Sequence, residues 1–470
     1  MLKLRIGRLV GVLAVITVVA SYAPIDARVA GATGRIHYTN YAAPKSFGTS
    51  TGEPSIGADW KTGAVLIQSG IITLKVSFPD NSTTAKWANV TPENSVFTMD
   101  PILFTDPHTG RTSVSQLVSS LYVPGGGCSL AAVSDDDGAT WIPSTGCGLP
   151  GTYDHQSIGG GPFAVSGDKI SYEDANYYCG QNGITANCAL SRDGGVTYGA
   201  AVPVYYDLQS ESDQIPDDGQ NHCMGLHGHI KVGPDGTAYL PNFRCYVNGK
   251  EMQAVLVSED DGQTWTVRPI PGSHYNNFRS DPSVGIGTDN TVYFSYEDKD
   301  REVKVAVSHD HGKTWTKPID LESPNGIHYG VFPAVVAGDK DRAAVAFLGA
   351  SRLDKNKKYG YEDGKYKGMW DLYVSTTLNG GKTWTTVDAT PTDPVQRGCI
   401  WWGNAGGCPG AQRNLLDFMD ATLDKAGHVL VGYADGCIGK CVHGKVNSQS
   451  AVATIARQTS GPSLFTSHRP

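Results

Sequence analysis

Acidic side chains that stand directly before short apolar stretches are the residues of this chain best suited to chemistry. Glu53 precedes Pro-Ser-Ile-Gly, Asp100 precedes Pro-Ile-Leu-Phe, and Asp281 precedes Pro-Ser-Val-Gly. Cleavage of a glycosidic bond needs one carboxylic acid to protonate the leaving oxygen and a second group to attack or stabilise the anomeric carbon. The candidate catalytic residues are Glu53, Asp100, Asp154, Asp281, Tyr296 and Glu297.

Side chains that suit sugar binding stand at comparable places along the chain. Arginine and histidine donate hydrogen bonds to hydroxyl groups, and the adjacent Trp401 and Trp402 either stack on a sugar ring or anchor their own loop. The candidate binding residues are His155, His227, His229, Arg244, Arg279, Trp401, Trp402, Arg413 and Asp417. The histidines of the H-x-H pair, His227 and His229, could bind a metal together with Asp154 and His155. Such a pair is weak evidence for a metal site, so we expect no metal and no cofactor.

The same acids also have a structural explanation. An aspartate before Pro-Ser accepts hydrogen bonds from nearby backbone amides and fixes a turn without doing chemistry. For any single one of Glu53, Asp100 and Asp281 this explanation is the stronger one. For the whole group, we expect at least two members to serve function.

An octapeptide that recurs along the chain identifies the elements that must position these residues. "SDDDGATW" (Ser134–Trp141) is followed by "SRDGGVTY", "SEDDGQTW", "SHDHGKTW" and the degenerate "TLNGGKTW", which starts at Thr377, at intervals of 50 to 69 residues. Such a period is the signature of a repeat architecture. The acid-rich copy is no EF-hand loop, because Ile142–Gly148 supplies no acid.

The octapeptide has the composition of a tight turn. Its glycine permits a positive φ, and the acid at the third position accepts backbone N–H bonds. The predicted turn acids are Asp136, Asp193, Asp260, Asp310 and Asn379. We expect Trp141 to pack between sheets, and Asp135 and Asp137 to face solvent.

Seven β-hairpins alternate with the octapeptides. Each hairpin is a short apolar stretch, a turn rich in Gly, Asp or Pro, and a second apolar stretch; the hairpins start at Glu53, Asp100, His155, His227, Asp281, Phe332 and Asp417. Units of about 60 residues predict an all-β fold, a single β-propeller of four-stranded blades A to D, with seven blades and six as the alternative. The octapeptides are then the C–D turns. The last blade lacks one strand, which we expect from 34–40.

Antiparallel blades divide their connections between two faces. The starts of the innermost strands A share one face, here called the mouth face, with the B–C connections, and the A–B and C–D turns share the other, here called the turn face. The long connections fall on the mouth face, where function usually resides. The predicted ends of strands B add Glu173, Asp174, Asn242, Arg244, Tyr296, Glu297, Asp298, Tyr433 and Asp435 to it.

The N-terminal residues and the cysteines predict export. Lys3, Arg5 and Arg8 precede a twelve-residue apolar stretch, which is typical of a cleaved signal peptide. We therefore expect a signal peptide at 1–32, cut at about 23–32, a propeller at 33–461 and a tail at 462–470. Five disulfides are expected from proximity: Cys128–Cys147, Cys179–Cys188, Cys223–Cys245, Cys399–Cys408 and Cys437–Cys441.

The composition of the 470-residue chain limits the classes of partner. A net charge of −8 argues against a nucleic-acid partner, which needs a basic surface. The apolar stretch near the N-terminus is too short for a membrane span, and no later one is long enough. We expect a secreted or periplasmic monomer whose partner is a glycan.

The octapeptide S-x-D-x-G-x-T-W resembles the Asp box, and the chain is similar in this to the sialidase (BNR-repeat) superfamily of β-propellers. The resemblance implies the propeller fold but not one activity, because both glycosidases and non-catalytic proteins carry the motif. In a sialidase, three arginines hold the substrate carboxylate, a Tyr–Glu pair supplies the nucleophile and an Asp is the acid/base. The first arginine is expected where this chain has Glu53, and an acid there repels a carboxylate.

By this resemblance, the remaining arginines at the mouth are Arg244, Arg279 and Arg413. Tyr296 with Glu297, or Tyr433, could form the nucleophile pair. Three functions therefore stay open: a sialidase-like glycoside hydrolase, a hydrolase of neutral glycans that uses two carboxylates, and a non-catalytic secreted propeller that binds glycan or protein.

Overall fold

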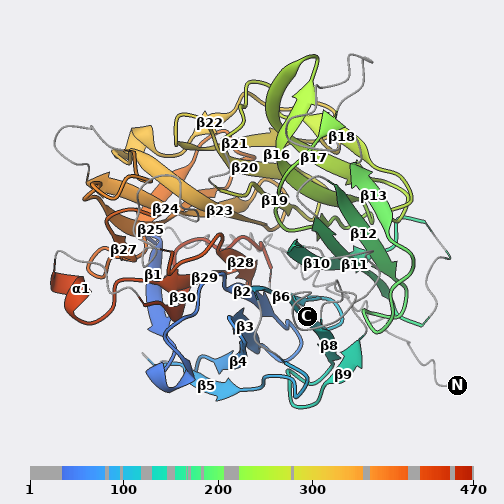
Figure 1. Ribbon diagram of the computed structural model, residues 1–470, viewed down its shortest axis with the longest axis horizontal. Helices are drawn as coiled ribbons and strands as arrows, with labels where there is room; N and C mark the ends of the chain where they lie inside the picture. The colour runs from blue at the N-terminus through green and yellow to red at the C-terminus, as the bar shows by residue number, and fades with distance from the viewer. Residues whose placement is uncertain are drawn as a thin grey trace, which may run out of the picture.

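Seven small antiparallel sheets stand side by side in a ring (Figure 1). The computed structural model describes residues 34–79, 84–95, 99–117, 130–144, 154–165, 167, 171–181, 185–205, 222–276, 280–352, 360–400, 413–444 and 450–467. Each sheet is one blade whose strands follow the chain from the inside of the ring to its outside. The predicted seven-bladed β-propeller is therefore confirmed.

The strands of the first four blades are these. Blade 1 has β2 (Ser55–Ala58), β3 (Val65–Ser69), β4 (Ile72–Ser77) and β5 (Lys86–Asn89), and blade 2 has β6 (Met99–Thr105), β7 (Thr112–Leu117), β8 (Leu130–Ser134) and β9 (Ile142–Ser144). Blade 3 has β10 (Asp154–Pro162), β11 (Asp174–Gln181), β12 (Ala186–Ser191) and β13 (Val202–Tyr205). Blade 4 has β14 (His222–Cys223), β15 (Lys231–Val232), β16 (Ala238–Val247), β17 (Lys250–Ser258) and β18 (Thr266–Pro269).

The remaining three blades close the ring. Blade 5 has β19 (Ser283–Ile286), β20 (Val292–Glu297), β21 (Val303–Ser308) and β22 (Ile319–Asp320). Blade 6 has β23 (Tyr329–Ala337), β24 (Ala343–Arg352), β25 (Met369–Thr377), β26 (Thr385–Asp388) and β27 (Gln396–Arg397), and blade 7 has β28 (Asp420–Leu423), β29 (Val429–Asp435) and β30 (Val452–Ser460). The short helices are η1 (Lys45–Phe47), η2 (Ser323–Asn325) and α1 (Lys440–His443).

The strand missing from blade 7 comes from the other end of the chain. β1 (His37–Ala42) pairs antiparallel with β30, and the register joins Tyr41 to Ile455. Two β1 side chains, Tyr38 and Tyr41, are buried. The prediction that 34–40 closes the ring is confirmed, with the strand starting three residues later.

The octapeptides are C–D turns with one repeated hydrogen-bond pattern. In the copy at Ser308, the serine Oγ accepts the Gly312 N–H at 2.8 Å, and Asp310 accepts the Thr314 N–H at 2.8 Å and its hydroxyl at 2.7 Å. Asp136, Asp193 and Asp260 make the same bonds in their turns. Asn379 accepts the Thr383 N–H but donates through Nδ2 to the Thr383 hydroxyl. Trp141 packs between blades 1 and 2 and donates to Val90 O, as predicted.

Asp135 is exposed to solvent, as predicted, whereas Asp137 is not. Asp137 is buried with φ +57°, bonds to Lys75 and accepts from Thr62 of blade 1. Asp135 pairs with Arg111 of its own blade. Asp261 and His311 occupy the position equivalent to Asp137, also at positive φ, and reach the A–B turn of the preceding blade. The residue before the recurring turn glycine thus points sideways because its left-handed backbone turns it out of the strand.

Three of the five predicted disulfides lie within the described residues, and all three are formed: Cys179–Cys188, Cys223–Cys245 and Cys437–Cys441. Cys399 is also disulfide-bonded, whereas Cys128, Cys147 and Cys408 lie outside the described residues, as does the predicted signal peptide. Bonds of this kind are typical of oxidising compartments. Of the described helices, none has the length and apolar character needed to cross a membrane.

Candidate functional site

The starts of the innermost strands share a strained backbone conformation. Glu53, Asp100 and His155 have φ of +53°, +50° and +55°, and Phe332 has +57°. Such values cost residues other than glycine roughly 1 kcal/mol or more and tend to occur at functional sites. Proline follows three of these four residues. The chain therefore turns sharply from the mouth face into strand A at equivalent places in several blades.

Side chains two residues further along lock neighbouring blades together. Ser55 Oγ accepts the N–H of Leu103 in blade 2 at 2.7 Å, and Ser157 Oγ accepts the N–H of Ile230 in blade 4 at 2.9 Å. Asp420 closes the ring by accepting the N–H of Ile56 at 3.3 Å. Because these bonds fix the height of each strand A against the next, they bring the strand starts to one level around the channel.

The Glu53 carboxyl group is the most deeply buried acid of this ring. It is 1% exposed, and its backbone N–H donates to Leu415 O at 3.1 Å. Burial, followed by the negative charges of Asp100 and Asp417, raises the pKa of Glu53 well above its ordinary range. A hydrogen bond between the carboxyl groups of Glu53 and Asp417 acts in the same direction. The Glu53 carboxyl group is therefore protonated more readily than an ordinary glutamate, and it is hydrogen-bonded to Asp417.

Asp100, His155 and Asp281 are connected in sequence across the mouth. Asp100 Oδ2 accepts the His155 N–H at 3.0 Å, and His155 Nε2 lies 2.9 Å from Asp281 Oδ2. His155 is 4% exposed, whereas the Asp281 side chain is 11% exposed. The imidazole therefore lies beneath an acid that stays more accessible than the ring itself.

The other two candidate histidines border an apolar wall. The ring of His229 lies 4.5 Å from that of Phe418, and His155 packs edge-on to His227 at 6.0 Å. Burial and the charge of Lys231 lower the pKa of His229 well below its ordinary value, so its imidazole is neutral near pH 7. His227 bonds to the Gly228 carbonyl through Nδ1. These contacts place histidines of blade 4 against blades 3 and 7.

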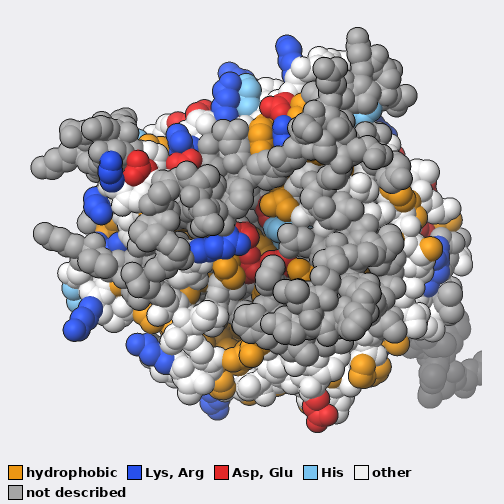
Figure 2. All heavy atoms as spheres, viewed as in Figure 1, with side chains coloured by type: hydrophobic (Ala, Val, Ile, Leu, Met, Phe, Trp, Pro, Cys, Tyr) orange, Lys and Arg blue, Asp and Glu red, His pale blue; other side chains and the backbone are white. Residues whose placement is uncertain are grey.

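Arg413 and Asp417 form the accessible edge of the ring. The guanidinium makes two bonds to the carboxylate, at 2.7 and 3.0 Å, and the two side chains are 39% and 21% exposed. Figure 2 shows acidic and histidine side chains together in the hollow at the centre of the ring, with a basic side chain at its edge. A two-bond arginine–carboxylate pair is strong and fixes the orientation of both groups.

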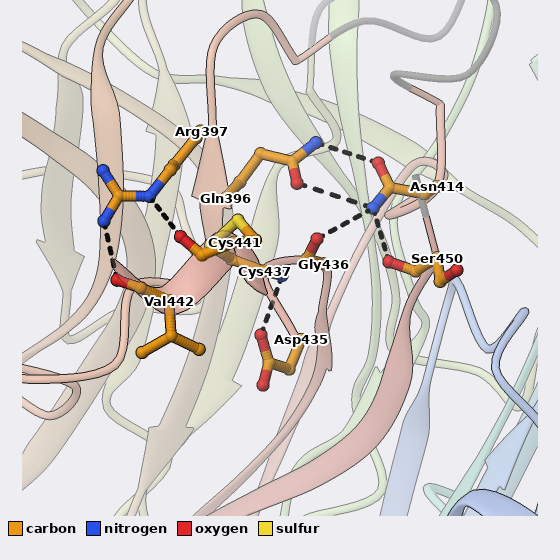
Figure 3. Close-up of a disulfide and its surroundings, with 9 residues drawn as sticks. All are labelled: Gln396, Arg397, Asn414, Asp435, Gly436, Cys437, Cys441, Val442 and Ser450. Carbon is orange, nitrogen blue, oxygen red and sulfur yellow. Dashed lines mark hydrogen bonds between the residues drawn. A yellow bond between two sulfur atoms is a disulfide. The ribbon is translucent and has the colours of Figure 1, made fainter. Parts of the chain in front are cut away.

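The backbone beside Arg413 is anchored to a disulfide-bonded segment (Figure 3). Asn414 donates to Ser450 O at 2.8 Å and accepts from Gln396 at 2.8 Å. Arg397 donates to Cys441 O at 2.8 Å, next to the bond between Cys437 and Cys441. Blade 6, blade 7 and the B–C connection of blade 7 thus hold the arginine-bearing turn in place.

A cavity of about 230 Å³ follows the inner strands below the mouth. Its walls are mostly apolar, with Ile56, Ile158 and Val284 among them, but His229 and Lys231 also line it. The ammonium group of Lys231 lies 3.7 Å from Asp420 Oδ1 inside this channel. The cavity continues to the A–B turns on the turn face, where Asp106 and His108 border it.

The contacts of Tyr296 and Glu297 are with aromatic residues of blades 5 and 6. Tyr296 is fully buried and packs against Phe294 in the cluster that also contains Trp315, and burial raises the pKa of its phenol far above the ordinary value. Glu297 accepts the hydroxyl of Tyr361 at 2.8 Å. Successive residues of β20 point to opposite faces of the blade, which separates this pair.

The remaining sequence candidates have mixed positions. Arg244 stacks over Tyr275 at 4.6 Å and pairs with Glu251, apart from the ring acids. Asp154 begins β10. Arg279, Trp401 and Trp402 lie outside the described residues. Phe418 and Lys231 were missed by sequence reasoning, although both stand next to or within predicted strand starts.

Glu173 and Asp174 were assigned to the mouth face wrongly. β11 begins at Asp174, so these residues follow the A–B connection and lie on the turn face. The short stretch "KISY" before them has the composition of a strand B, which would place them at its end. Strand B of blade 3 is instead formed by the apolar run "ANYYCG", which pairs with both β10 and β12.

Comparison with known proteins supports the repeat. The family model described as BNR/Asp-box repeat matches residues 306–317. A search of curated proteins found no match. Similar solved structures include the Hadza microbial sialidase Hz136 (13% identity, TM-score 0.39, 88% of this chain and 68% of that one) and a GH74 xyloglucanase from Xanthomonas campestris (12%, 0.46, 85% and 53%). The fungal lectin from Aleuria aurantia, a six-bladed propeller, is 14% identical, with a TM-score of 0.40 over 76% of this chain and 95% of that one.

At this level of similarity, these structures carry no argument about the activity of this chain. The match to the family model and the five octapeptide turns identify the BNR/Asp-box repeat. The chain is a seven-bladed β-propeller that carries BNR/Asp-box repeats.

Proposed function

We propose that this protein is a secreted glycoside hydrolase that cleaves neutral glycans at the mouth of its propeller. The observation that carries the proposal is the hydrogen bond between the buried carboxyl group of Glu53 and the more exposed carboxyl group of Asp417, together with the raised pKa of Glu53. A carboxyl group whose pKa is raised beside a second carboxyl group is the arrangement that glycosidases use to protonate a leaving group.

The residues have different roles in this proposal. Glu53 is too buried to touch a substrate, so it stores the proton and passes it to Asp417, which is 21% exposed. Asp417 delivers the proton to the glycosidic oxygen, and Arg413 holds its orientation through two hydrogen bonds. Asp281, which lies 2.9 Å from His155 Nε2, is the second carboxylate and stabilises the positive charge that develops at the anomeric carbon, where water adds as the leaving group departs.

Charge around the mouth favours a neutral substrate over a sialoside. Glu53, Asp100, Asp281 and Asp417 converge there, and a substrate carboxylate next to them is repelled. Of the three arginines considered from the sequence, Arg413 is already paired with Asp417 and Arg244 with Glu251.

The experiment is a turnover screen of the secreted protein against aryl glycosides of neutral sugars and of sialic acid. We expect turnover of a neutral glycoside that Asp417→Asn reduces at least hundredfold, because the amide cannot deliver a proton. Asp289→Asn, an exposed acid in an A–B turn of blade 5, is the matched control and keeps full activity. Turnover of the sialoside alone, or an unaffected Asp417→Asn variant, contradicts the proposal.

A non-catalytic glycan-binding propeller is the second candidate. The low exposure of Glu53 and His155, 1% and 4%, favours it because groups this buried also serve to hold the blades. Binding of a neutral glycan without turnover in the same screen, with binding lost in Arg413→Ala, selects this function.

A further inference from the structure

A cluster of three metal-ligating side chains lies on the turn face, away from the mouth. Asp106 and His108 belong to the A–B turn of blade 2, and Asp174 begins β11 in blade 3. One ligand atom from each of the three lies within 4.8 Å of the other two. His108 Nδ1 is 3.4 Å from Asp174 Oδ2.

The two carboxylates are buried but not neutralised by the lysine and arginine on the adjacent turns. Asp106 is 5% exposed and Asp174 is 7% exposed. Lys61 donates instead to Thr109 O at 2.7 Å, and Arg111 pairs with Asp135. Two like charges side by side in a shielded place are costly unless a cation or a proton joins them.

One buried oxygen of the cluster lacks a hydrogen bond from the part of the chain that the structure describes. This oxygen is Asp174 Oδ2, and the group that faces it is His108 Nδ1 at 3.4 Å. Buried polar atoms are normally satisfied, so an unsatisfied carboxylate oxygen pointing at a second acid and an imidazole indicates a missing positive partner. Asp106, by contrast, already accepts the His108 N–H at 2.9 Å through Oδ1, which fixes the turn that carries the imidazole.

We infer that Asp106, His108 and Asp174 bind a divalent first-row transition ion of the Zn²⁺ or Mn²⁺ class, which links blade 2 to blade 3. Two carboxylates and one imidazole nitrogen form a mixed oxygen and nitrogen set, which suits these ions better than Ca²⁺, a cation that prefers oxygen ligands alone. Ligand atoms about 2.1 Å from one ion lie on the order of 3–4 Å apart, so rotation of the exposed His108 is enough to complete the site.

The position of the cluster gives the ion a path to solvent. Asp106 and His108 line the same cavity that runs through the centre of the ring, and the His108 side chain is 59% exposed. Three protein ligands leave further coordination positions for water on the cavity side. The site does not depend on the glycan-binding role of the mouth, because none of its residues lies on that face.

The test uses the full secreted protein without a histidine tag, after treatment with a chelator. We expect Zn²⁺ and Mn²⁺ each to bind with a stoichiometry of one by calorimetry and to raise the thermal midpoint of unfolding. Co²⁺ as a spectroscopic probe should give d–d absorption bands that His108→Ala removes.

His108→Ala and Asp174→Asn should each weaken Zn²⁺ binding at least tenfold. His108 is exposed, so its variant is expected to fold even if an acid variant does not. His37→Ala removes another exposed histidine, on β1, and is the control with unchanged binding. Absence of binding, or equal binding by His108→Ala and the unmodified protein, overturns the assignment. Ca²⁺ binding that exceeds Zn²⁺ binding and survives His108→Ala also overturns it.

Discussion

The octapeptide acids on the turn face and the buried acids of the mouth face have opposite electrostatic properties. On the turn face, hydrogen bonds from the side chain and backbone of Thr314 lower the pKa of Asp310 to about 2, and the backbone and side chain of Thr140 lower that of Asp136. On the mouth face, burial raises the pKa of Glu53 and, to about 7, that of Asp435. An acid that receives many hydrogen bonds fastens a turn, whereas a buried acid near other acids keeps a proton.

The comparison teaches that abundance of acid is a poor guide to chemistry. The octapeptide with three consecutive aspartates is scaffold, since each of the three has a structural partner. The mouth acids are spread one per blade and meet only when the ring closes. Substitutions on the two faces should therefore separate function from stability.

The largest expected effect is on turnover, from Glu53→Gln. The amide is isosteric but supplies no carboxylic proton, so we expect kcat on a neutral glycoside to fall about 10³-fold. Because a neutral amide avoids the like charges of Asp100 and Asp417, the thermal midpoint should not fall. Parallel kinetics and thermal unfolding check both statements, and a variant that unfolds while its residual kcat is unchanged contradicts the assigned role.

A box acid that joins two blades should matter next most, and for stability alone. Asp261 is 2% exposed and accepts the backbone N–H groups of Ala164 and Val165 in blade 3, at 2.7 and 3.0 Å. Asp261→Ala leaves both donors without this partner and should cost roughly 2–3 kcal/mol of unfolding free energy. Denaturant unfolding measures it. Asp341→Ala, a left-handed residue in the A–B turn of blade 6, is the comparison on the same face; equal losses would show that turn geometry rather than the blade contact matters.

The third prediction concerns the box acid itself. Asp310→Ala removes the bonds to Thr314 at an exposed turn, so we expect a loss of about 1 kcal/mol at pH 7. The folded-state pKa of about 2 lies below the unfolded value, so this contribution is present at neutral pH and disappears as the pH falls through 2. Unfolding curves at pH 7 and pH 3 should show a smaller difference between variant and parent at pH 3. A constant difference would contradict the electrostatic explanation.

The extent to which sequence predicted these features follows from the range of the interactions. The box turns are local, with every bond spanning two to four residues, so the repeat and the blade count could be read directly. Asp137 was misread because its partner Thr62 lies 75 residues away in another blade. The Glu53–Asp417 pair joins the first blade to the last, and only closure of the ring by β1 and β30 makes them neighbours.

Blade 3 shows the second limit. Both "KISY" and "ANYYCG" have the residues of a strand, and spacing could not decide which one pairs with β10. The pairing of "ANYYCG" with both β10 and β12 makes this run strand B. Asp174 therefore lies on the turn face and not on the mouth face. The metal cluster with Asp106 and His108 was invisible to the sequence analysis for that reason.

The last expected effect is a pH dependence on the mouth face. Asp435 ends β29, accepts the Cys437 N–H at 3.0 Å, and has its pKa raised to about 7, chiefly by burial. Because the folded protein binds this proton more tightly than the unfolded chain, the stabilisation is fully present below about pH 4 and is lost as the pH rises through 7. Asp435→Asn keeps the acceptor oxygen but cannot ionise, so it should match the parent at pH 4 and exceed it at pH 8. Thermal midpoints across this range test the sign, with Asp289→Asn as the control; a variant less stable than the parent at pH 8 would mean that Asp435 is stabilised as an anion and behaves like the box acids of the opposite face.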